Sequence, residues 1–482
     1  MKISTELFNN CKTVLKVSNP KNGSFDFSLC TDSRHFKKND AFLPLVGDSF
    51  DGHTFITTIL KMEPSIVFFE TGKIGGELMQ ENNRVVFVEV SDSLLFLQEL
   101  ATRHVEKWNK LKNKKIIGIT GSNGKTTHKE MLKHIMEGLF PGKVLSTQGN
   151  LNNHIGVPLT VLKLEPHHEI AIVEMGMNHQ GEIRVLCDIA KPSSGLITNI
   201  GPAHIEFLKT MENIFLEKST LYIESCRAEY GAGLFVANYD DDYLKRLHTH
   251  KTETKKPLLY FSENETPLPE EAKNTGAILN KVKIDNQAVQ ISFADETWNF
   301  SNPAINEKYN LKNLSGVVLL SFGLFPTSGQ DIMKLASNFV MPSMNRSLWL
   351  GNIFLDAYNA NPGSMRTSLH SFAEYVKNKG ESLEECLFVL GDMNELGEFA
   401  PSFHKEIGEL LQSLNARKVV FVGRYVSFYK KGYLNECSSF ADVNELLKTW
   451  KNISEHSKYI FIKGSRSVGL EQIVKDQVGT AH

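Results

Sequence analysis

The stretch from Gly118 to Thr127 reads GITGSNGKTT and decides the fold expected for this chain. An apolar run at 116–119 leads into it and predicts a buried strand, while apolar residues on one face of 131–139 predict a helix after it. Glycines allow a tight turn with inward-pointing N–H groups, and the helix N-terminus adds positive potential. A glycine-rich turn without a nucleotide is the alternative, but strand, loop and helix together favour a phosphate-binding loop.

This loop predicts an ATP site. Lys125 would contact the β and γ phosphates, and the Thr126 hydroxyl could ligate Mg²⁺. The ATP-binding residues expected here are Gly121, Ser122, Asn123, Gly124, Lys125, Thr126 and Thr127. The full phosphate-loop pattern has a glycine where this chain has Ile119. Kinases, ATPases and ligases share the device, so the loop alone does not define the reaction.

Short apolar runs, each followed by a helical pattern, recur outward from the loop. They read IIGIT, EIAIVEMG, GLITNIG and GLFVAN, and later IFLDAYN, CLFVLGD, KVVFVG and YIFIKG. This alternation predicts parallel strands with crossover helices in two open α/β domains. Residues 258–300 differ, because polar and apolar residues alternate there and predict antiparallel strands.

The length of 482 residues predicts several domains, because single cores stop growing well below that size. A lysine-rich stretch at 107–115 and the turn-forming FPTSGQ at 325–330 mark two candidate boundaries. We therefore expect three α/β domains. They are a small N-terminal α/β domain at 1–112, a central P-loop ATPase-like parallel-sheet domain at 113–327, and a C-terminal Rossmann-like domain at 328–482.

Composition narrows the function classes. The formal net charge of -2 offers no general attraction to nucleic acid or to an anionic membrane, and no stretch approaches about 18 uninterrupted apolar residues. The six cysteines lie far apart without a CxxC pair, which predicts buried free thiols in a reducing compartment. The N-terminal residues lack the apolar core of a signal peptide. We expect a cytoplasmic protein without nucleic-acid partners or membrane insertion.

Polar residues follow several apolar runs, at the positions where open α/β sheets bind ligands. Glu174 ends one run, His204 follows the next, and Lys218 lies on the helical segment after it. A carboxylate and an imidazole beside a phosphate loop are suitable Mg²⁺ ligands or phosphate contacts. Each residue alone is more often structural, so the prediction of a site rests on their joint placement.

The last third of the chain has the same arrangement. The polar residues that follow its apolar runs are Asp356, Tyr358, Asn359, Asn361, Asp392, Glu395, Lys463, Ser465 and Arg466. Helix capping is the alternative for residues of these types, Ser465 among them. Residue types and spacing therefore predict an ATP-using, multi-domain α/β enzyme.

In their order along the chain, these motifs resemble the Mur ligase family of peptidoglycan synthesis. The motifs are TGSNGKTT at 120–127, GNLNNHIGVP at 149–158, EMG at 174–176 and TNIGPAH at 198–204. DAYNANPGSM at 356–365, LGDMNELG at 390–397 and KGSRS at 463–467 look like the member that adds D-alanyl-D-alanine. TDSR at 31–34, FLPLVG at 42–47 and FDGHTFI at 50–56 are similar to the domain that grips UDP.

The resemblance implies an ATP-dependent ligase that joins D-alanyl-D-alanine to a UDP-linked muramoyl tripeptide. A carboxylate is a poor electrophile because its leaving group would be oxide, so ATP would first convert it to an acyl phosphate. The implied cofactors are ATP and Mg²⁺, and the implied partners are the two substrates. We expect a monomer.

The resemblance also implies residue roles. The catalytic residues would be Lys125, Lys218, His204 and Arg346, with Arg346 approaching the γ-phosphate. Mg²⁺ would be bound by Thr126, Glu174, His204 and a carbamylated Lys218. Adenine and ribose would lie against Asn238, Asp356, Tyr358 and Asn359. Substrate contacts would come from Ser33, Arg34, His53, Asn150, Asn152, Asn153, Asn361, Lys463 and Ser465.

Three positions depart from the family pattern. Asn345 stands where a glycine usually precedes the arginine, Thr220 replaces a common glutamate, and the chain reads EKST at 217–220 in place of AKSE. We interpret these as local drift. The alternatives are a family ligase with another acceptor, of the third-residue-adding, folylpolyglutamate or cyanophycin type, and a non-catalytic nucleotide-binding relative.

Overall fold

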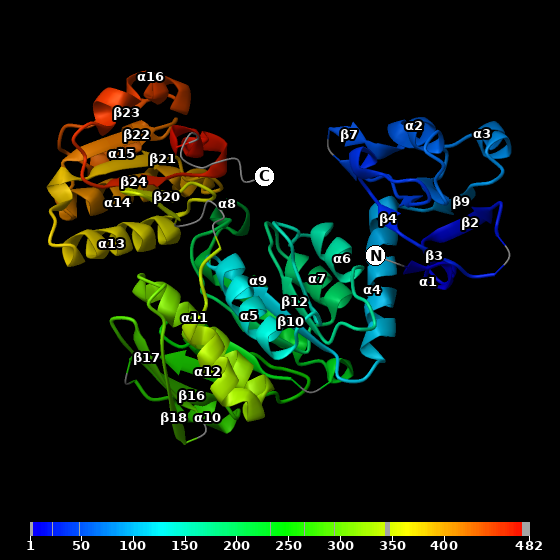
Figure 1. Ribbon diagram of the computed structural model, residues 1–482, viewed down its shortest axis with the longest axis horizontal. Coiled ribbons are helices and arrows are strands. Elements are labelled where there is room, and N and C mark those ends of the chain that lie inside the picture. Colours follow the sequence, from blue (N-terminus) through cyan, green and yellow to red (C-terminus); the bar gives the residue numbers. More distant parts are fainter. Residues whose placement is uncertain are drawn as a thin grey trace.

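The computed structural model describes residues 3–21, 23–47, 49–231, 233–264, 266–293, 295–342 and 348–474. Three large sheets, of five, nine and six strands, succeed one another along the chain. Figure 1 shows the bodies around them, with the central one below and the N-terminal and C-terminal ones on either side above it. The three-domain α/β architecture expected from the sequence is confirmed. In the described part of the chain, no helix is both long and apolar enough to cross a membrane.

The central sheet carries the phosphate loop. Its strand order is β11-β12-β10-β13-β14-β15-β16-β17-β18, parallel as far as β16 and antiparallel from there to β18. The strands are β10 (Lys115–Thr120), β11 (Val144–Ser146), β12 (Ile170–Glu174), β13 (Ser194–Ile197), β14 (Phe235–Asn238), β15 (Leu258–Ser262), β16 (Ile278–Asp285), β17 (Ala288–Phe293) and β18 (Glu296–Ser301). The prediction of parallel strands is confirmed. The prediction of antiparallel strands at 258–300 is confirmed for β16 to β18 but is wrong for β15, which pairs in parallel with β14 and β16.

Helices cover both faces of this sheet, because its strands are apolar on both sides. The helices are α5 (Lys125–Leu139), α6 (Gly156–Val161), α7 (Glu182–Ala190), α8 (Ile205–Leu208), α9 (Met211–Ser225), α10 (Glu270–Asn274), α11 (Lys308–Leu324) and α12 (Gly329–Ser337). Ile117 and Ile119 pack with residues of α5 and α11, whereas Ile116 belongs to the core that includes α7 and α9. Side chains of β10 point to both faces of the sheet, so this one strand packs against a helical layer on each face.

The N-terminal sheet has the order β2-β9-β8-β5-β4, with only the β2–β9 pair antiparallel. Its elements and neighbours are β1 (Ile3–Ser4), α1 (Thr5–Asn9), β2 (Val14–Ser18), β3 (Asp26–Phe27), β4 (Leu29–Cys30), β5 (Ala41–Phe42), β6 (Val46–Gly47), β7 (Phe50–Asp51), α2 (Ile56–Leu60), β8 (Ile66–Glu70), α3 (Gly76–Glu81), β9 (Val86–Val90) and α4 (Ser93–Asn109). Helix α4 packs on α6 and α7, and Trp108 Nε1 donates to the Glu165 carbonyl at 3.0 Å. The lysine-rich stretch thus begins inside a docked helix, and only its later residues form a connection.

The C-terminal sheet has the order β19-β20-β24-β21-β22-β23, parallel except for the β19–β20 pair. Its elements are β19 (Leu348–Leu350), β20 (Ile353–Asp356), α13 (Pro362–Asn378), β21 (Leu387–Gly391), α14 (Ala400–Ser413), β22 (Lys418–Val422), α15 (Val426–Gly432), β23 (Ser438–Phe440), α16 (Val443–Ser454) and β24 (Ile460–Lys463). The four strands predicted here are all present and mutually parallel.

The turn at 325–330 does not separate two bodies. Helix α12 follows it and packs against α5 and β18, and Ile332 and Phe339 share a buried core with Ile135. A domain limit at 327 would divide that core. We therefore propose that the boundary between the central and C-terminal domains lies between Phe339 and Leu348, and not at 327. The limit near 112 stays a proposal.

Candidate active site

The phosphate loop has a backbone that only glycine can adopt at its two ends. Gly121 has a φ of 150°, and a Cβ there would lie 1.8 Å from Thr198 Oγ1. Gly124 has a φ of 76° and precedes the first turn of α5. Left-handed conformations carry little steric cost for glycine alone. The two glycines thus let the loop approach the neighbouring strand end and turn into the helix.

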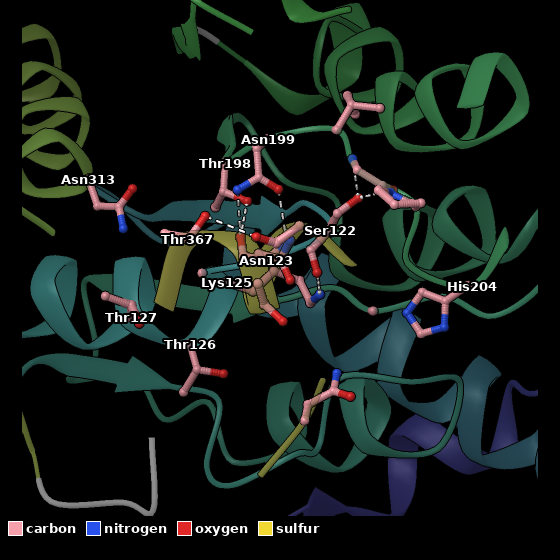
Figure 2. A pocket seen from close by; sticks show the side chains of 18 of the residues that line it. Ser122, Asn123, Lys125, Thr126, Thr127, Thr198, Asn199, His204, Asn313 and Thr367 are labelled. Carbon is pink, nitrogen blue, oxygen red and sulfur yellow. Dashed lines mark hydrogen bonds between the residues drawn. The ribbon is translucent and has the colours of Figure 1, made fainter. Parts of the chain in front are cut away.

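The segment after β13 holds this loop in place. Asn123 N donates to Asn199 Oδ1 at 2.9 Å, and the Asn123 carbonyl accepts from Thr198 Oγ1 at 2.5 Å (Figure 2). Ser122 Oγ donates to the Gly201 carbonyl at 2.9 Å. Lys125 Nζ donates to the Gly121 carbonyl at 2.7 Å. The loop is therefore organised by the protein itself before any ligand contact.

A cavity of about 900 Å³ opens over the loop and reaches the C-terminal domain. The predicted residues that line it are Ser122, Asn123, Gly124, Lys125, Thr126, Thr127, Asn150, Asn152, Asn153, Glu174, His204, Asn238, Asp356, Tyr358, Asn359 and Lys463. In Figure 2, His204 and Asn313 lie on opposite sides of the loop. Side chains from β-strand ends in two domains therefore share one space.

Glu174 is a buried carboxylate that lines this cavity. Its Oε2 accepts a hydrogen bond from Thr126 Oγ1 and its Oε1 one from Asn152 Nδ2, both at 2.9 Å. Among the described residues, no three His, Cys, Asp or Glu side chains form a group that could hold a metal alone. Mg²⁺ commonly takes one or two carboxylates, with phosphate and water oxygens completing its octahedron. A hydroxyl and a carboxylate beside a phosphate loop fit that donor set.

His204 contacts the C-terminal domain. It has a left-handed backbone, with a φ of 61°, and its Nδ1 lies 2.6 Å from Glu395 Oε2, although the two groups lack hydrogen-bond alignment. Burial lowers the pKa of His204 in spite of the opposing effect of Glu395. The same contact lowers the pKa of the Glu395 carboxyl. A backbone hydrogen bond of 3.2 Å from Glu206 N to the Glu395 carbonyl adds to this link between the two domains.

Lys218 lies on α9 and is completely buried. Its Nζ has no hydrogen-bond partner among the residues that the structure describes. Burial, and then the positive charge of Lys125, hold the pKa of Lys218 well below its ordinary value. An uncharged amine in this position is a nucleophile, whereas a buried ammonium without a partner would be costly.

The residues after β20 are held by Lys463. This buried lysine pairs with Asp356 at the ends of two adjacent strands, and its Nζ donates to the Asn359 carbonyl at 3.2 Å. Asp356 also accepts from Ser368 Oγ at 2.9 Å. Lys463 lines the cavity and is held by Asp356 and Asn359, which supports a positioning role, while its direct contact with substrate stays a prediction.

Ser465 and Asn361 lie beside the cavity. Ser465 Oγ accepts from Asn394 N at 3.0 Å and makes no cap bond to the short helix η8 (Arg466–Val468). Asn361 does cap a helix, because its side chain accepts from Ser364 N at 2.9 Å. Its Nδ2 also donates to Asn123 Oδ1 at 2.6 Å. Asn361 thus caps α13 and contacts the phosphate loop.

The predicted N-terminal contacts do not line this cavity. Ser33 and Arg34 lie in the short helix η1 (Ser33–His35), where the exposed Arg34 pairs with Asp32 at 2.7 Å. Both ring nitrogens of His53 have internal partners, with Nδ1 2.6 Å from Asp51 Oδ1 and Nε2 accepting from Glu70 N at 3.1 Å. These contacts orient His53 within its loop, and its contact with substrate stays a prediction. Arg346 lies outside the described residues.

Reasoning from the sequence missed the first turn of α11. The residues there that line the cavity are Tyr309, Asn310, Lys312 and Asn313, and Asn313 lies close to Gly124 of the phosphate loop. Lys312 Nζ donates to Asp240 Oδ2 at 2.6 Å, which joins the helix to the end of β14. Two amides three residues apart at a helix start were the available signal, because they face the same side of a helix. No apolar run ends there, so the strand-end rule did not find them.

Comparison with known proteins agrees with this arrangement. The family models described as "Mur ligase middle domain" and "Mur ligase, glutamate ligase domain" match residues 119–320 and 346–466. The UDP-N-acetylmuramoyl-tripeptide--D-alanyl-D-alanine ligase of Bacillus subtilis is 30% identical, over 93% of each chain. The Treponema pallidum protein of that name is 31% identical, over 92% of each chain. A crystal structure of MurF from Acinetobacter baumannii is 26% identical over 99% of each chain, with a TM-score of 0.81. The chain therefore belongs to the Mur ligase family of ligases.

Proposed function

We propose that this chain is an ATP-dependent ligase that joins D-alanyl-D-alanine to a UDP-N-acetylmuramoyl-tripeptide through an acyl phosphate. Relatives matched over more than nine-tenths of the chain carry that name. The observation that supports the proposal is one cavity between the phosphate loop and the residues after β20, in which a nucleotide and an acceptor could lie side by side. The proposal favours this acceptor over those of other family ligases.

The nucleotide would lie with its phosphates on the loop at 121–127. Lys125 would exchange the Gly121 carbonyl for a phosphate oxygen, because that carbonyl is a weaker partner for an ammonium than an anion is. Asn238, Tyr358 and Asn359 would face the nucleoside, together with the amides of the first turn of α11. These roles are proposals that the shared cavity supports.

Mg²⁺ would be held by Thr126 and Glu174, with His204 as a further proposed ligand. Bound there, the ion would offset charge on the transferring phosphoryl group. Glu174 can act only as an acceptor when ionised, and the hydrogen bond from Asn152 orients it. Asn152 thereby couples the 149–158 segment to the position of the carboxylate.

Lys218 is proposed to be carbamylated. Its neutral amine would attack CO₂, forming an N–C bond and releasing one proton to solvent. The product carboxylate would be an anion near Lys125, whose charge now disfavours an ammonium at this position. The carbamate would replace an unsatisfied buried nitrogen with oxygen acceptors for the metal site.

The C-terminal domain is proposed to exclude water from the acyl phosphate. It touches the phosphate loop through Asn361 and the α8 region through Glu395. Excluding water protects reactive intermediates from hydrolysis.

The UDP group would bind the N-terminal domain near Ser33 and Arg34. A hydrogen bond of 3.1 Å from Gln98 on α4 to the His154 carbonyl joins that domain to the 149–158 segment.

The test is phosphate release from Mg-ATP with the muramoyl tripeptide, in its lysine and diaminopimelate forms, with and without D-alanyl-D-alanine. Release that requires both substrates is expected, with the pentapeptide as product. Release with neither requirement would identify a plain ATPase, and ATP binding without release would favour another acceptor or a non-catalytic relative.

The monomeric state and cytoplasmic location of the protein are also proposals. The absence of disulfides among the described cysteines supports a reducing compartment.

A further inference from the structure

Lys129 is a buried lysine next to the candidate active site that the proposed reaction does not use. It lies on α5, one turn after Thr126, and only 1% of it is exposed. Its Nζ donates to the Thr147 carbonyl at 3.0 Å and lies 2.6 Å from Glu130 Oε1. A fully buried ammonium is expensive, and a hydrophobic side chain of the same length would often be at least as stabilising. Its presence therefore points to a purpose other than stability.

The partner of Lys129 leads directly to Glu174. Thr147 follows β11, and its Oγ1 accepts a hydrogen bond of 3.0 Å from the backbone N–H of Glu174. Its own N–H donates to the Ile172 carbonyl at 3.0 Å, which continues the ladder between β11 and β12. Thr147 is buried and does not line the cavity. It connects α5 to the strand end that carries the carboxylate.

Two residues of one helix face thus hold Glu174 from two directions. Thr126 Oγ1 contacts the Glu174 carboxylate, while Lys129 holds Thr147 and so the backbone of Glu174. The chain then enters the 149–158 segment, whose Asn152 contacts the other carboxylate oxygen. Partners behind a metal-binding side chain fix its orientation and are commonly as influential as the ligand itself.

We propose that Lys129 is a positioning residue that sets the place of Glu174, through Thr147, for the metal site of the proposed ligase reaction. The inference rests on the proposed function for its catalytic consequence. The anchoring of Glu174 by Lys129 and Thr147 is a property of the protein without substrates, and it can be measured separately.

Backbone hydrogen exchange at Glu174, in nucleotide-free protein, tests the anchor. Lys129→Met keeps the length of the side chain and removes the ammonium, and Lys133→Met makes the same change one turn further along α5 as the control. We expect the Glu174 amide to exchange about 5- to 10-fold faster in Lys129→Met, because that increase corresponds to the loss of one ordinary hydrogen bond. In Lys133→Met the amide should exchange at the wild-type rate. Unchanged exchange in a folded Lys129→Met protein would overturn the proposal.

Thr147 supplies a second pair of variants should Lys129→Met fold poorly. Thr147→Val removes the acceptor of the Glu174 N–H and keeps the side-chain shape, whereas Thr147→Ser keeps the hydroxyl. Faster exchange is expected in Thr147→Val only. Equal exchange in both variants would count against the anchor.

The consequence for the metal site is measured by Mn²⁺ binding in the presence of a non-hydrolysable ATP analogue and by the Mg²⁺ dependence of turnover. Lys129→Met and Thr147→Val are expected to weaken metal binding about 10- to 100-fold and to lower kcat, with KM for D-alanyl-D-alanine unchanged. Normal metal binding would overturn the positioning role. Because the exchange experiment needs no substrate, it decides the anchor even if the proposed ligase reaction fails.

Discussion

Asn361 Nδ2 donates a hydrogen bond of 2.6 Å to Asn123 Oδ1, and so joins the phosphate loop to a helix start 238 positions further along the chain. The same Asn361 side chain caps α13 by accepting from Ser364 N. One amide group therefore serves two structures, with its oxygen committed to the helix and its nitrogen to the loop.

The two uses of Asn361 can be separated by substitution. Asn361→Asp keeps an acceptor for the Ser364 N–H but cannot donate to Asn123, so we expect near-normal stability and a fall in kcat/KM for ATP of about 10-fold. Asn361→Ala should lose both, with about 1 kcal/mol less stability. Thermal unfolding and steady-state kinetics measure the two effects. Normal kinetics in Asn361→Asp would show that the contact between domains is dispensable.

Thr126 provides a test of the metal site. Thr126→Ser keeps the hydroxyl that donates to Glu174, whereas Thr126→Val is nearly isosteric and removes it. We expect Thr126→Ser to retain turnover within a few-fold and Thr126→Val to lose about 100-fold or more, as expected when a group stabilising transferred charge is removed. Turnover measured across a range of Mg²⁺ concentrations compares them. Equal activity of the two variants would exclude the hydroxyl as a ligand.

Lys218 should be modified in the active protein. Incubation with ¹³C-bicarbonate is expected to give a carbamate carbon signal in the wild-type protein that Lys218→Met lacks, because burial holds the pKa of this lysine well below its ordinary value. Lys218→Met should also reduce turnover by about 100-fold or more, since it removes an anion from the metal site. Near-normal turnover in Lys218→Met would remove the carbamate from the mechanism.

His128 should make the protein more sensitive to acid. It is buried on α5, its Nδ1 lies 2.8 Å from the Gly124 carbonyl, and burial lowers its pKa to about 4. The unfolded chain, with an ordinary histidine pKa near 6.5, takes up a proton first as the pH falls, so acid favours unfolding. The stability from neutral His128 is complete above about pH 6.5, and about 2 kcal/mol of it should be lost between pH 7 and pH 5.

His128→Gln is the matched variant, because its amide can still donate to the Gly124 carbonyl but does not titrate. Urea unfolding at pH 7 and pH 5 compares the two proteins. The loss of stability between these pH values should be smaller in His128→Gln by about the same 2 kcal/mol. An identical loss in both proteins would assign the acid sensitivity to other groups.

Much of the central domain could be predicted from local signals. The glycines of GITGSNGKTT, the apolar run before them and the helical face after them all act over fewer than about twenty residues, and each has one favoured structure. The strand-end rule found Glu174 and Asp356 because parallel strands align their carboxyl ends at one edge. The Mur ligase resemblance, confirmed by the comparisons, rests on these same segments.

The predictions failed or stayed incomplete where packing decided the outcome. The turn at 325–330 has the composition of a linker, yet α12 buries Ile332 against α5 and stays with the central domain. No local signal marked the start of α11 as part of a site, and only the fold brings Asn310 to the cavity. Polar residues such as His53 have backbone and side-chain partners within the protein, and their contact with a ligand stays a prediction.

The sequence by itself determined the strand, loop and helix of the phosphate site, because glycine conformations and apolar periodicity act within a short stretch. It also indicated the family, through the resemblance of motifs along the chain. Only the tertiary structure decided that Asn123 contacts Asn361 and that His204 contacts Glu395. It also decided that Lys129 is connected to Glu174 through Thr147. Such contacts join residues distant along the chain. They depend on how whole layers and domains pack, which no local pattern of residues specifies.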